Sequence, residues 1–386
     1  MGASLAVVPS PATPPAGGQA RRPIGVVKLN GTEMTGVLSV KTVNNAHSQA
    51  DTFEVVIALQ GQGATSNWAA LGGDDSNPEI EILYGLMDPN TGKRGALTSA
   101  VLGPADKVKI SQAKNTATLS GRDYSGALID TQTFGNFTNQ TASQIATTIA
   151  GNHGLTAQVV ATTTPVGSKD EETGEYSRVT RRESEWDLLT NLARNEGYSC
   201  YVRGKTLFFG PDQPPSGTPY KLTWTPAKTP GAPPSANVTS IDLERSLTLA
   251  KDIIVQVVSH HAGSGKAVTG TAQSKGSAGT GKAPSKPQTY TIDVPGLTAA
   301  QATARAAQLL KTYSQFERVI SVDMPGDPFL TFEQPLALSG TGTSWDGPYF
   351  ADRIERDLSM QGGFKMKIRA KNHPTGQTET VGPTSS

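Results

Sequence analysis

The chain has 386 residues, a formal net charge of +1 and a hydrophobic fraction of 36%. This length exceeds one ordinary core, so we expect two or three domains, and the near-neutral charge argues against binding nucleic acid through bulk electrostatics. The one cysteine excludes an intrachain disulfide, and neither a secretory signal nor an apolar stretch long enough to span a membrane is visible. We therefore expect synthesis in a reducing cytoplasm and no membrane anchor.

The N-terminal third of the sequence is predicted to be an arm followed by β-structure. Residues 1–22 are rich in Pro, Ala and Gly, which is typical of a flexible arm. Residues 23–125 show the period-two alternation of strands, clearest where Phe53 and Ile57 fall on one face. Because the strands are separated by Gly, Asn and Pro turns, we expect a small β-barrel with Phe53 and Ile57 in its core.

The middle of the chain, residues 126–230, is predicted to be a small α+β domain. Thr141 and Gln144 have the spacing of a capping box at the start of one helix. Ser184 can cap a second helix, which Gly197 is suited to end in the left-handed conformation. A hairpin follows, and the helix stripe and hairpin supply the predicted core: Trp186, Leu189, Leu192 and Phe209.

The C-terminal third is predicted to be a second β-barrel over residues 231–372. A run of Gly, Ser, Thr, Lys and Ala at 262–287 favours an inserted flexible loop, and a capping box at Thr298 begins a helix over 298–316. Ile254 and Val257 are the expected core residues of this barrel, and residues 373–386 are expected to be a disordered tail. The predicted fold class is therefore mainly β, with two related barrel domains flanking a small α+β middle domain.

A weak internal repeat relates the two β regions at an offset of 201 residues. It matches Val37 with Val238, Val40 with Ile241, Phe53 with Ile254 and Val56 with Val257. So few matches in a chain rich in Val and Ser leave both a duplication and chance open.

Three features of the sequence suggest chemistry, and each has a simpler explanation. Cys200 alternates with inward-facing strand residues, which favours a buried thiol over a nucleophile. The stretch "GSAGTGKA" at 276–283 approaches a phosphate-binding loop, but Ala283 replaces the hydroxyl residue and Pro284 obstructs the helix that should follow. His260 and His261 are adjacent on an expected strand and point to opposite faces, so they cannot readily share a metal ion. We predict no catalytic, cofactor-binding or metal-binding residue.

The segment "ESEWDLLTNLARNEGYSCYVRGKTLFFGP", residues 183–211, resembles the middle-domain signature of the phage late control gene D family. Members are baseplate hub proteins of contractile tails and also form the hub of type VI secretion VgrG proteins. Similar segments begin at Leu119 and Thr141 and cover 348–370, so the resemblance extends over residues 24–372. The signature positions are Trp186, Asp187, Leu188, Leu192, Ala193, Gly197, Tyr198, Gly204, Leu207, Phe209, Gly210 and Pro211.

This resemblance implies a non-enzymatic virion protein of the tail baseplate, made in the host cytoplasm. In the family, three copies form a ring of six barrels that joins a hexameric tail tube to a trimeric spike around a central channel. The implied partners are the tail tube protein, a separate spike protein and other baseplate subunits, while DNA passes without specific binding. Two alternatives stay open: a tail-associated peptidoglycan hydrolase, and the equivalent hub at the tip of a non-contractile tail.

Overall fold

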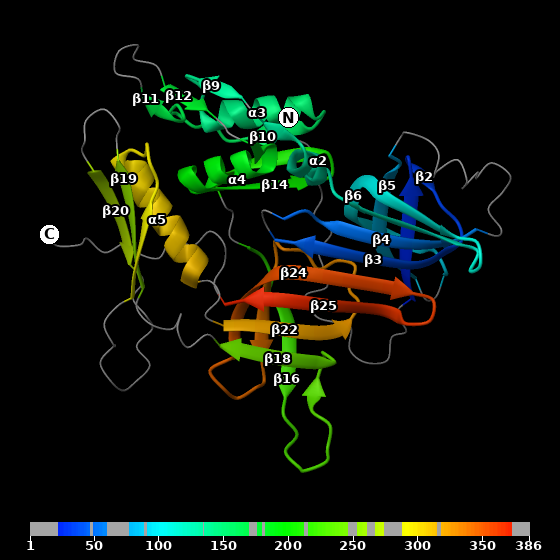
Figure 1. Ribbon diagram of the computed structural model, residues 1–386. Helices are drawn as coiled ribbons and strands as arrows, with labels where there is room; N and C mark the ends of the chain where they lie inside the picture. Colours follow the sequence, from blue (N-terminus) through cyan, green and yellow to red (C-terminus); the bar gives the residue numbers. More distant parts are fainter. Residues whose placement is uncertain are drawn as a thin grey trace. The chain divides into compact units, whose positions relative to one another are not determined.

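The chain is mainly β and divides into two units (Figure 1). The first unit contains Met1–Tyr124, Pro215–Leu243 and Ile320–Ala370, and the second contains Ser125–Pro214, Glu244–Val319 and Lys371–Ser386. The computed structural model describes residues 22–46, 49–59, 77–88, 91–133, 135–169, 176–179, 182–211, 215–245, 253–260, 267–273, 288–314 and 318–372.

The first barrel lies in the first unit, and its strands run in the spatial order β3-β4-β7-β6-β5-β1, with β2 beyond β1. Strand β6 turns a corner, because its first part pairs with β5 and its last part pairs with β7. Phe53 and Ile57 are buried in the core of this barrel. The strands are β1 (Arg22–Leu29), β2 (Thr32–Glu33), β3 (Val37–Asn45), β4 (Thr52–Ala58), β5 (Glu79–Met87), β6 (Arg94–Ser111) and β7 (Thr116–Arg122).

The second barrel also lies in the first unit, in the order β18-β22-β25-β24-β23-β16, with β17 beyond β16. Its core includes Tyr220, Leu222 and Ile368. We expected residue 220 in the middle domain, so the predicted boundary at 230 falls too late. The strands are β16 (Tyr220–Thr225), β17 (Ser235–Ala236), β18 (Ser240–Arg245), β22 (Arg318–Pro325), β23 (Pro335–Ser339), β24 (Gly347–Ser359) and β25 (Gly363–Lys371).

The two barrels have the same spatial order of strands when the strands are matched in the order in which they occur along the chain. Strands β1, β3, β4, β5, β6 and β7 correspond to β16, β18, β22, β23, β24 and β25. One pairing differs in direction, because β1 and β5 are antiparallel while β16 and β23 are parallel. The offset of 201 residues pairs β3 with β18, which correspond in strand order, but it pairs β4 with β19, whereas the counterpart of β4 is β22.

The second unit contains an α+β region after the first barrel. Thr141 and Gln144 form the expected capping box, Ser184 accepts a hydrogen bond from the Asp187 amide, and Gly197 has a φ of 70°. Trp186, Leu189, Leu192 and Phe209 are buried. The elements are α2 (Ser125–Asp130), β8 (Gln132–Thr133), β9 (Asn136–Thr138), α3 (Ala142–Asn152), β10 (Thr156–Val159), β11 (Ser168–Lys169), β12 (Tyr176–Val179), β13 (Glu183–Ser184), α4 (Glu185–Glu196), β14 (Tyr198–Arg203) and β15 (Thr206–Pro211).

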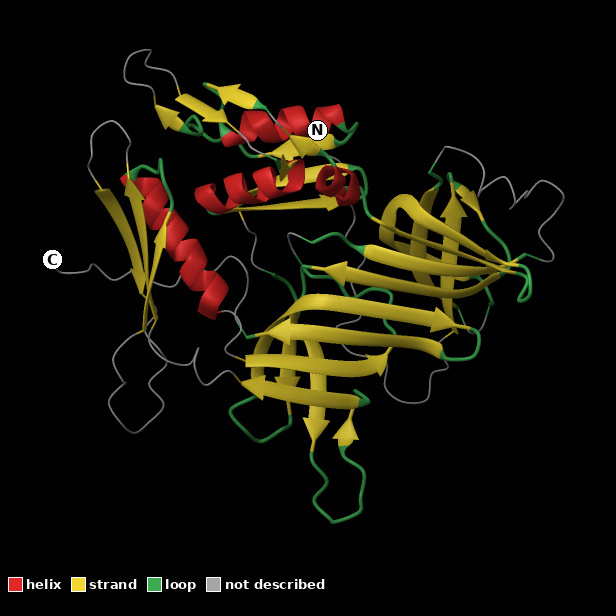
Figure 2. Cartoon of the chain, in the orientation of Figure 1, coloured by secondary structure: helices red, strands yellow, loops and turns green. Residues whose placement is uncertain are grey.

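A separate layer is inserted between β18 and β22, also in the second unit. Strands β19 (Ile253–His260), β20 (Ala267–Gln273) and β21 (Gln288–Asp293) form a sheet in the order β20-β19-β21, which packs against α5 (Ala299–Ser314) (Figure 2). Val257 is buried against this helix and Ile254 lies on the same strand, so neither belongs to the second barrel as we expected.

Strand β20 also corrects the expected flexible loop at 262–287. Its small residues look like a linker, but they let the helix approach the sheet. A Cβ on Gly270 would lie 2.2 Å from the backbone of Ala302 in α5. The low apolar content of β20 therefore reflects close packing against α5, while residues 262–266 and 274–287 lie outside the described residues.

Candidate functional site: the junction between the barrels

The two barrels of the first unit are joined by direct strand pairing. Strand β24 is long: its first part pairs with β23, and its last part pairs with β3 of the first barrel. The β24 and β3 partners are antiparallel, from Arg353 opposite Asn45 to Ser359 opposite Ser39. Because β25 also pairs with β24, one continuous sheet runs through β18-β22-β25-β24-β3-β4-β7-β6.

A buried arginine connects the barrels beneath this sheet. Arg356 of β24 is 4% exposed and donates from Nε to the Asp327 carbonyl at 3.0 Å and from Nη1 to Asn44 Oδ1 at 3.3 Å. Its Nη2 also donates to the carbonyl of Leu330. Burial lowers the pKa of Arg356, and nearby Tyr84 and Asp327 oppose that shift. The guanidinium therefore holds the β22–β23 loop against strand β3.

Asn44 extends the same polar network into the first barrel. Its Nδ2 donates to Asp51 Oδ2 at 2.8 Å and to the Ala100 carbonyl at 2.8 Å. Thr42, which is opposite Arg356 in the strand pair, has its hydroxyl 3.3 Å from that of Tyr84. Burial raises the pKa of Tyr84 to about 12. Each buried polar group of the network thus has a partner, as its low-dielectric surroundings require.

Apolar side chains from the β24–β25 hairpin fill the rest of the junction. Leu358 packs on the core of the first barrel, and the ring of Phe364 stacks on Tyr84 with centroids 5.2 Å apart. A Cβ on Gly25 would lie 2.8 Å from Leu358 Cδ2, so the glycine leaves room for this leucine. The second barrel therefore inserts a hydrophobic plug, Leu358 and Phe364, into the first.

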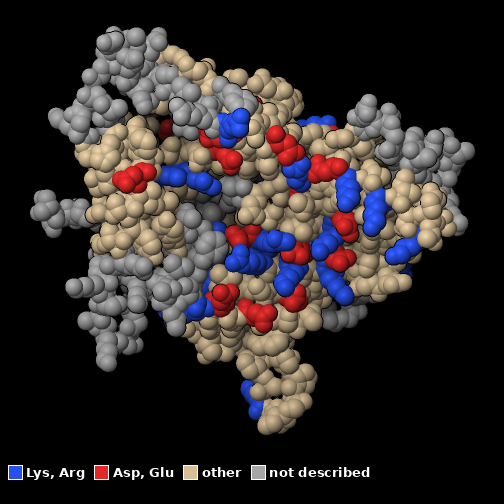
Figure 3. Space-filling view, viewed as in Figure 1, with Lys and Arg blue, Asp and Glu red and all other residues tan. Residues whose placement is uncertain are grey.

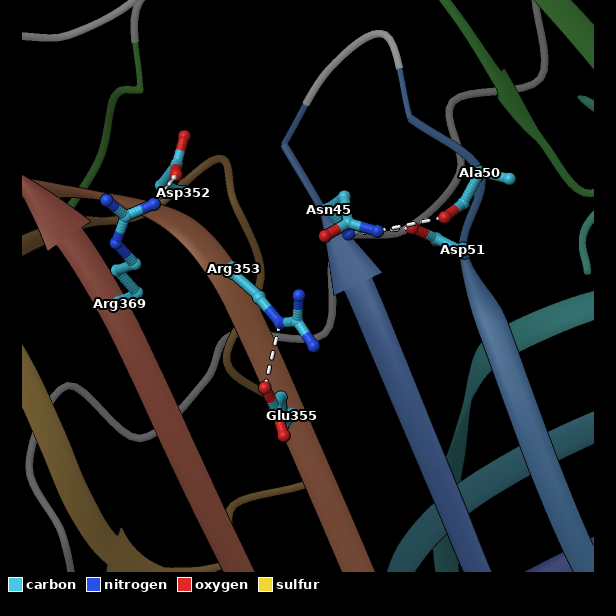
Figure 4. A network of polar contacts seen from close by, with 7 residues as sticks. All are labelled: Asn45, Ala50, Asp51, Asp352, Arg353, Glu355 and Arg369. Atoms are coloured by element: carbon cyan, nitrogen blue, oxygen red, sulfur yellow. Dashed lines mark hydrogen bonds and ion pairs between the residues drawn. The ribbon is translucent and has the colours of Figure 1, made fainter.

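The outer face of the sheet carries charges of both signs. At the end of the junction, the amide and the side chain of Asn45 donate hydrogen bonds to Asp51 and to the Ala50 carbonyl, which precede β4 (Figure 4). Ion pairs also join Arg353 to Glu355 and Arg369 to Asp352. Acidic and basic side chains are likewise interspersed over β3, β24 and β25 (Figure 3). A depression of about 610 Å³ on this face is lined by Lys41, Asp323, Glu355, Asp357, Lys365 and Lys367, among others. Such a surface has no strong field of one sign.

The residues that could suggest chemistry are scattered. Cys200 is buried in β14, where burial raises the pKa of its thiol to about 12, so the thiolate needed of a nucleophile is disfavoured. His260 is exposed at the end of β19, while His261 and the stretch 276–283 lie outside the described residues. Within the ranges that the structure describes, His, Cys, Asp and Glu form no group that could hold a metal ion, and no helix is long and apolar enough to cross a membrane.

One contact that sequence reasoning missed lies in the second unit. His153 Nε2, at the end of α3, is 2.5 Å from Glu185 Oε2, at the start of α4. The Glu185 amide also donates to the Thr131 carbonyl. The pair ties two helices together, and residues so far apart in sequence give no local signal of it.

Comparisons with known proteins identify the fold. Neither a protein-family model nor a curated protein matches this sequence. Among solved structures, a tail protein from Neisseria meningitidis is 17% identical, with a TM-score of 0.63 over 91% of this chain and 96% of that chain. The 43 kDa tail protein of prophage MuSo2 from Shewanella oneidensis is 16% identical, with a TM-score of 0.61 over 90% of this chain and 98% of that chain. A type VI secretion component of E. coli is 9% identical, with a TM-score of 0.53 over 92% of this chain and 80% of that chain. The chain therefore has the fold of phage tail and type VI secretion proteins.

Proposed function

We propose that this chain is the baseplate hub of a phage tail or of a related contractile injection particle. In this role it forms a homotrimer that joins a hexameric tail tube to a trimeric spike around a central channel. It acts through structure and not through catalysis, and it uses no cofactor.

The observation that carries this proposal is the matched strand order of the two barrels. Three copies of a chain with two equivalent barrels present six similar modules to one neighbour while keeping threefold symmetry for another. The fold shared with tail proteins supports the same role, since this chain covers nearly the whole length of the Neisseria and Shewanella proteins.

The mechanism is symmetry matching. One end of the ring of barrels seats the tube subunits, the other end seats the spike, and other baseplate subunits bind outside. Once the spike departs, DNA or another payload passes through the ring. The mixed charges over β3, β24 and β25 suit a surface that meets a polyanion without holding it, because strong binding requires a basic field.

The test is the stoichiometry of the complex with the tail tube protein of the same particle. Native mass spectrometry of the mixture should give one copy of this chain for every two tube subunits. A ratio of one to one, or failure to bind the tube, would overturn the adaptor role. Zymography on cell-wall substrate addresses the hydrolase alternative, and the proposal predicts no clearing.

A further inference from the structure

The second barrel has a long loop that the first barrel lacks at the corresponding connection. Residues 226–234, with the sequence "PAKTPGAPP", join Thr225 of β16 to Ser235 of β17. In the first barrel, β1 and β2 have the corresponding places in the sheet, and only Asn30 and Gly31 join them. The core of a barrel therefore does not require this loop.

The loop projects from the second barrel, beyond the ends of β16 and β17 (Figure 1). Every residue of 226–234 is exposed, four of them are proline, and Lys228 is the only charged one. Figure 3 accordingly shows a protrusion with little charge. A protruding segment that is mostly apolar and that the described part of the chain leaves uncovered is typical of a contact with another protein.

The tip of the loop has a defined turn. The Ala232 amide donates to the Thr229 carbonyl at 3.1 Å, and Gly231 has a φ of 84°. Proline at 230 followed by a glycine in the left-handed region is the sequence of a type II turn. Because the turn forms within the chain, little conformational freedom is lost when a partner binds the tip.

The base of the loop is fixed as well. Asn237, just after β17, accepts a hydrogen bond from the Thr223 amide at 2.8 Å and donates to the Lys221 carbonyl at 2.8 Å. Its amide also donates to the Thr223 carbonyl. These bonds hold the returning chain against β16, so the loop starts from a rigid base.

The loop leaves its barrel at the place that corresponds to the start of β1 in the first barrel. Strand β16 is parallel to β23, and Thr223 pairs with Ser339, the last residue of β23. Strand β1 is antiparallel to β5, so its first residue, Arg22, pairs with Met87 at the end of β5. Since β5 corresponds to β23, the chain before Arg22 is the counterpart in position of 226–234. Residues 1–21 lie outside the described residues.

We propose that residues 226–234 are a contact for the trimeric spike and not for the tail tube. This inference rests on the proposed function, in which six barrels meet a hexameric tube and three copies meet a trimeric spike. A hexameric partner takes the same contact from both barrels, whereas a feature of one barrel in each copy repeats three times around the ring. The prolines and alanines fit an apolar recess of the spike, because proline-rich segments bind aromatic and apolar grooves.

Replacing the loop by the turn of the first barrel tests this contact. Residues 226–234 are exchanged for Asn-Gly, the pair that joins β1 to β2 with φ values of 47° and 80°, so β16 and β17 can still form a hairpin. The Kd for the purified spike protein of the same particle should rise by about tenfold or more. The Tm, the native mass and the stoichiometry with the tube should stay unchanged.

The matched control is a chain without residues 2–20, which removes the segment at the corresponding place of the first barrel. It should bind the spike with unchanged Kd. An equal loss of affinity in the control and in the loop replacement would show a contact made by both barrels, and would contradict the threefold assignment.

A single substitution tests the shape of the tip. Gly231→Ala strains the backbone at a φ of 84°, so the affinity for the spike should fall by about threefold or more. Gly92→Ala, in the turn between β5 and β6 of the first barrel, introduces the same kind of strain at a φ of 63° and should leave this affinity unchanged. Both glycines have open space around an added Cβ, so the backbone alone is affected.

The outcomes separate this inference from the proposed function. If the loop replacement keeps its affinity for the spike, or if the unchanged chain binds no spike, the loop contact is wrong. A replacement that loses the trimer or the tube instead assigns the loop to another copy or to the tube, and also overturns the inference. A chain that needs the loop to bind the spike, yet never binds the tube, supports the contact and overturns the adaptor role.

Discussion

The two barrels share a strand order, but they present different side chains at corresponding edges. At the covered edge, the β24–β25 hairpin contributes Leu358 and Phe364 to the core of the other barrel. The corresponding positions in the β6–β7 hairpin are Gln112 and Asn115, which are polar. The covered edge therefore adds apolar side chains beside its buried polar network, whereas polar side chains occupy the corresponding positions of the other hairpin.

At the buried arginine the contrast is reversed. Arg356 corresponds to Ile110 in the first barrel, so the internal joint has a charge fixed by backbone carbonyls where β6 has a simple apolar side chain. A buried charge that lacks its partners is costly, so the junction depends on Arg356 keeping its three acceptors.

The largest expected effect breaks the internal joint at its centre. Arg356→Met leaves the carbonyls of Asp327 and Leu330 and the side chain of Asn44 without their donor, so the free energy of unfolding should fall by about 3 kcal/mol. Denaturant unfolding measures this. Arg353→Met is the matched control, since Arg353 is an exposed ion-pair member and should change stability by less than about 0.5 kcal/mol.

A second change compares the two hairpins directly. Leu358→Ala should reduce the free energy of unfolding by about 2 kcal/mol, because a partly buried leucine that packs on the first barrel loses its contacts. Gln112→Ala, at the corresponding place in the first barrel, should cost less than about 0.5 kcal/mol. Equal effects at the two positions would contradict the difference between the edges.

A third, smaller effect tests the fit of the plug. Gly25→Ala should cost about 1 kcal/mol, because its Cβ would press on Leu358 Cδ2. The cost should disappear in the background of Leu358→Ala, which a double-mutant cycle measures. Gly151→Ala is a control for the substitution itself: it lies in α3 with open space around its Cβ and should stabilise the protein by roughly 0.5–1 kcal/mol.

Local patterns in the sequence predicted many elements, because their signals lie within a few residues. The capping boxes, the strand alternation around Phe53 and the stripe of α4 all correspond to observed elements. The repeat also pairs β3 with β18, which correspond in strand order. It failed at β4 because an insertion with its own sheet and helix separates β18 from β22, and the alternating pattern of β19 looks the same in any sheet.

Contacts between distant segments could not be predicted in this way. Arg356 lies in β24 between residues that alternate like any strand, and nothing nearby in the sequence signals that its partner is Asn44. The pairing of β24 with β3 is equally hidden, since a strand sequence does not say which strands lie beside it.

In the proposed function three copies of this chain form one ring, and the native mass of the 386-residue chain tests this. Light scattering should give a species of three times 40.4 kDa, roughly 121 kDa, either alone or once the tail tube protein is added and its mass accounted for. A stable dimer, or a single copy bound to the tube, would overturn the proposed ring.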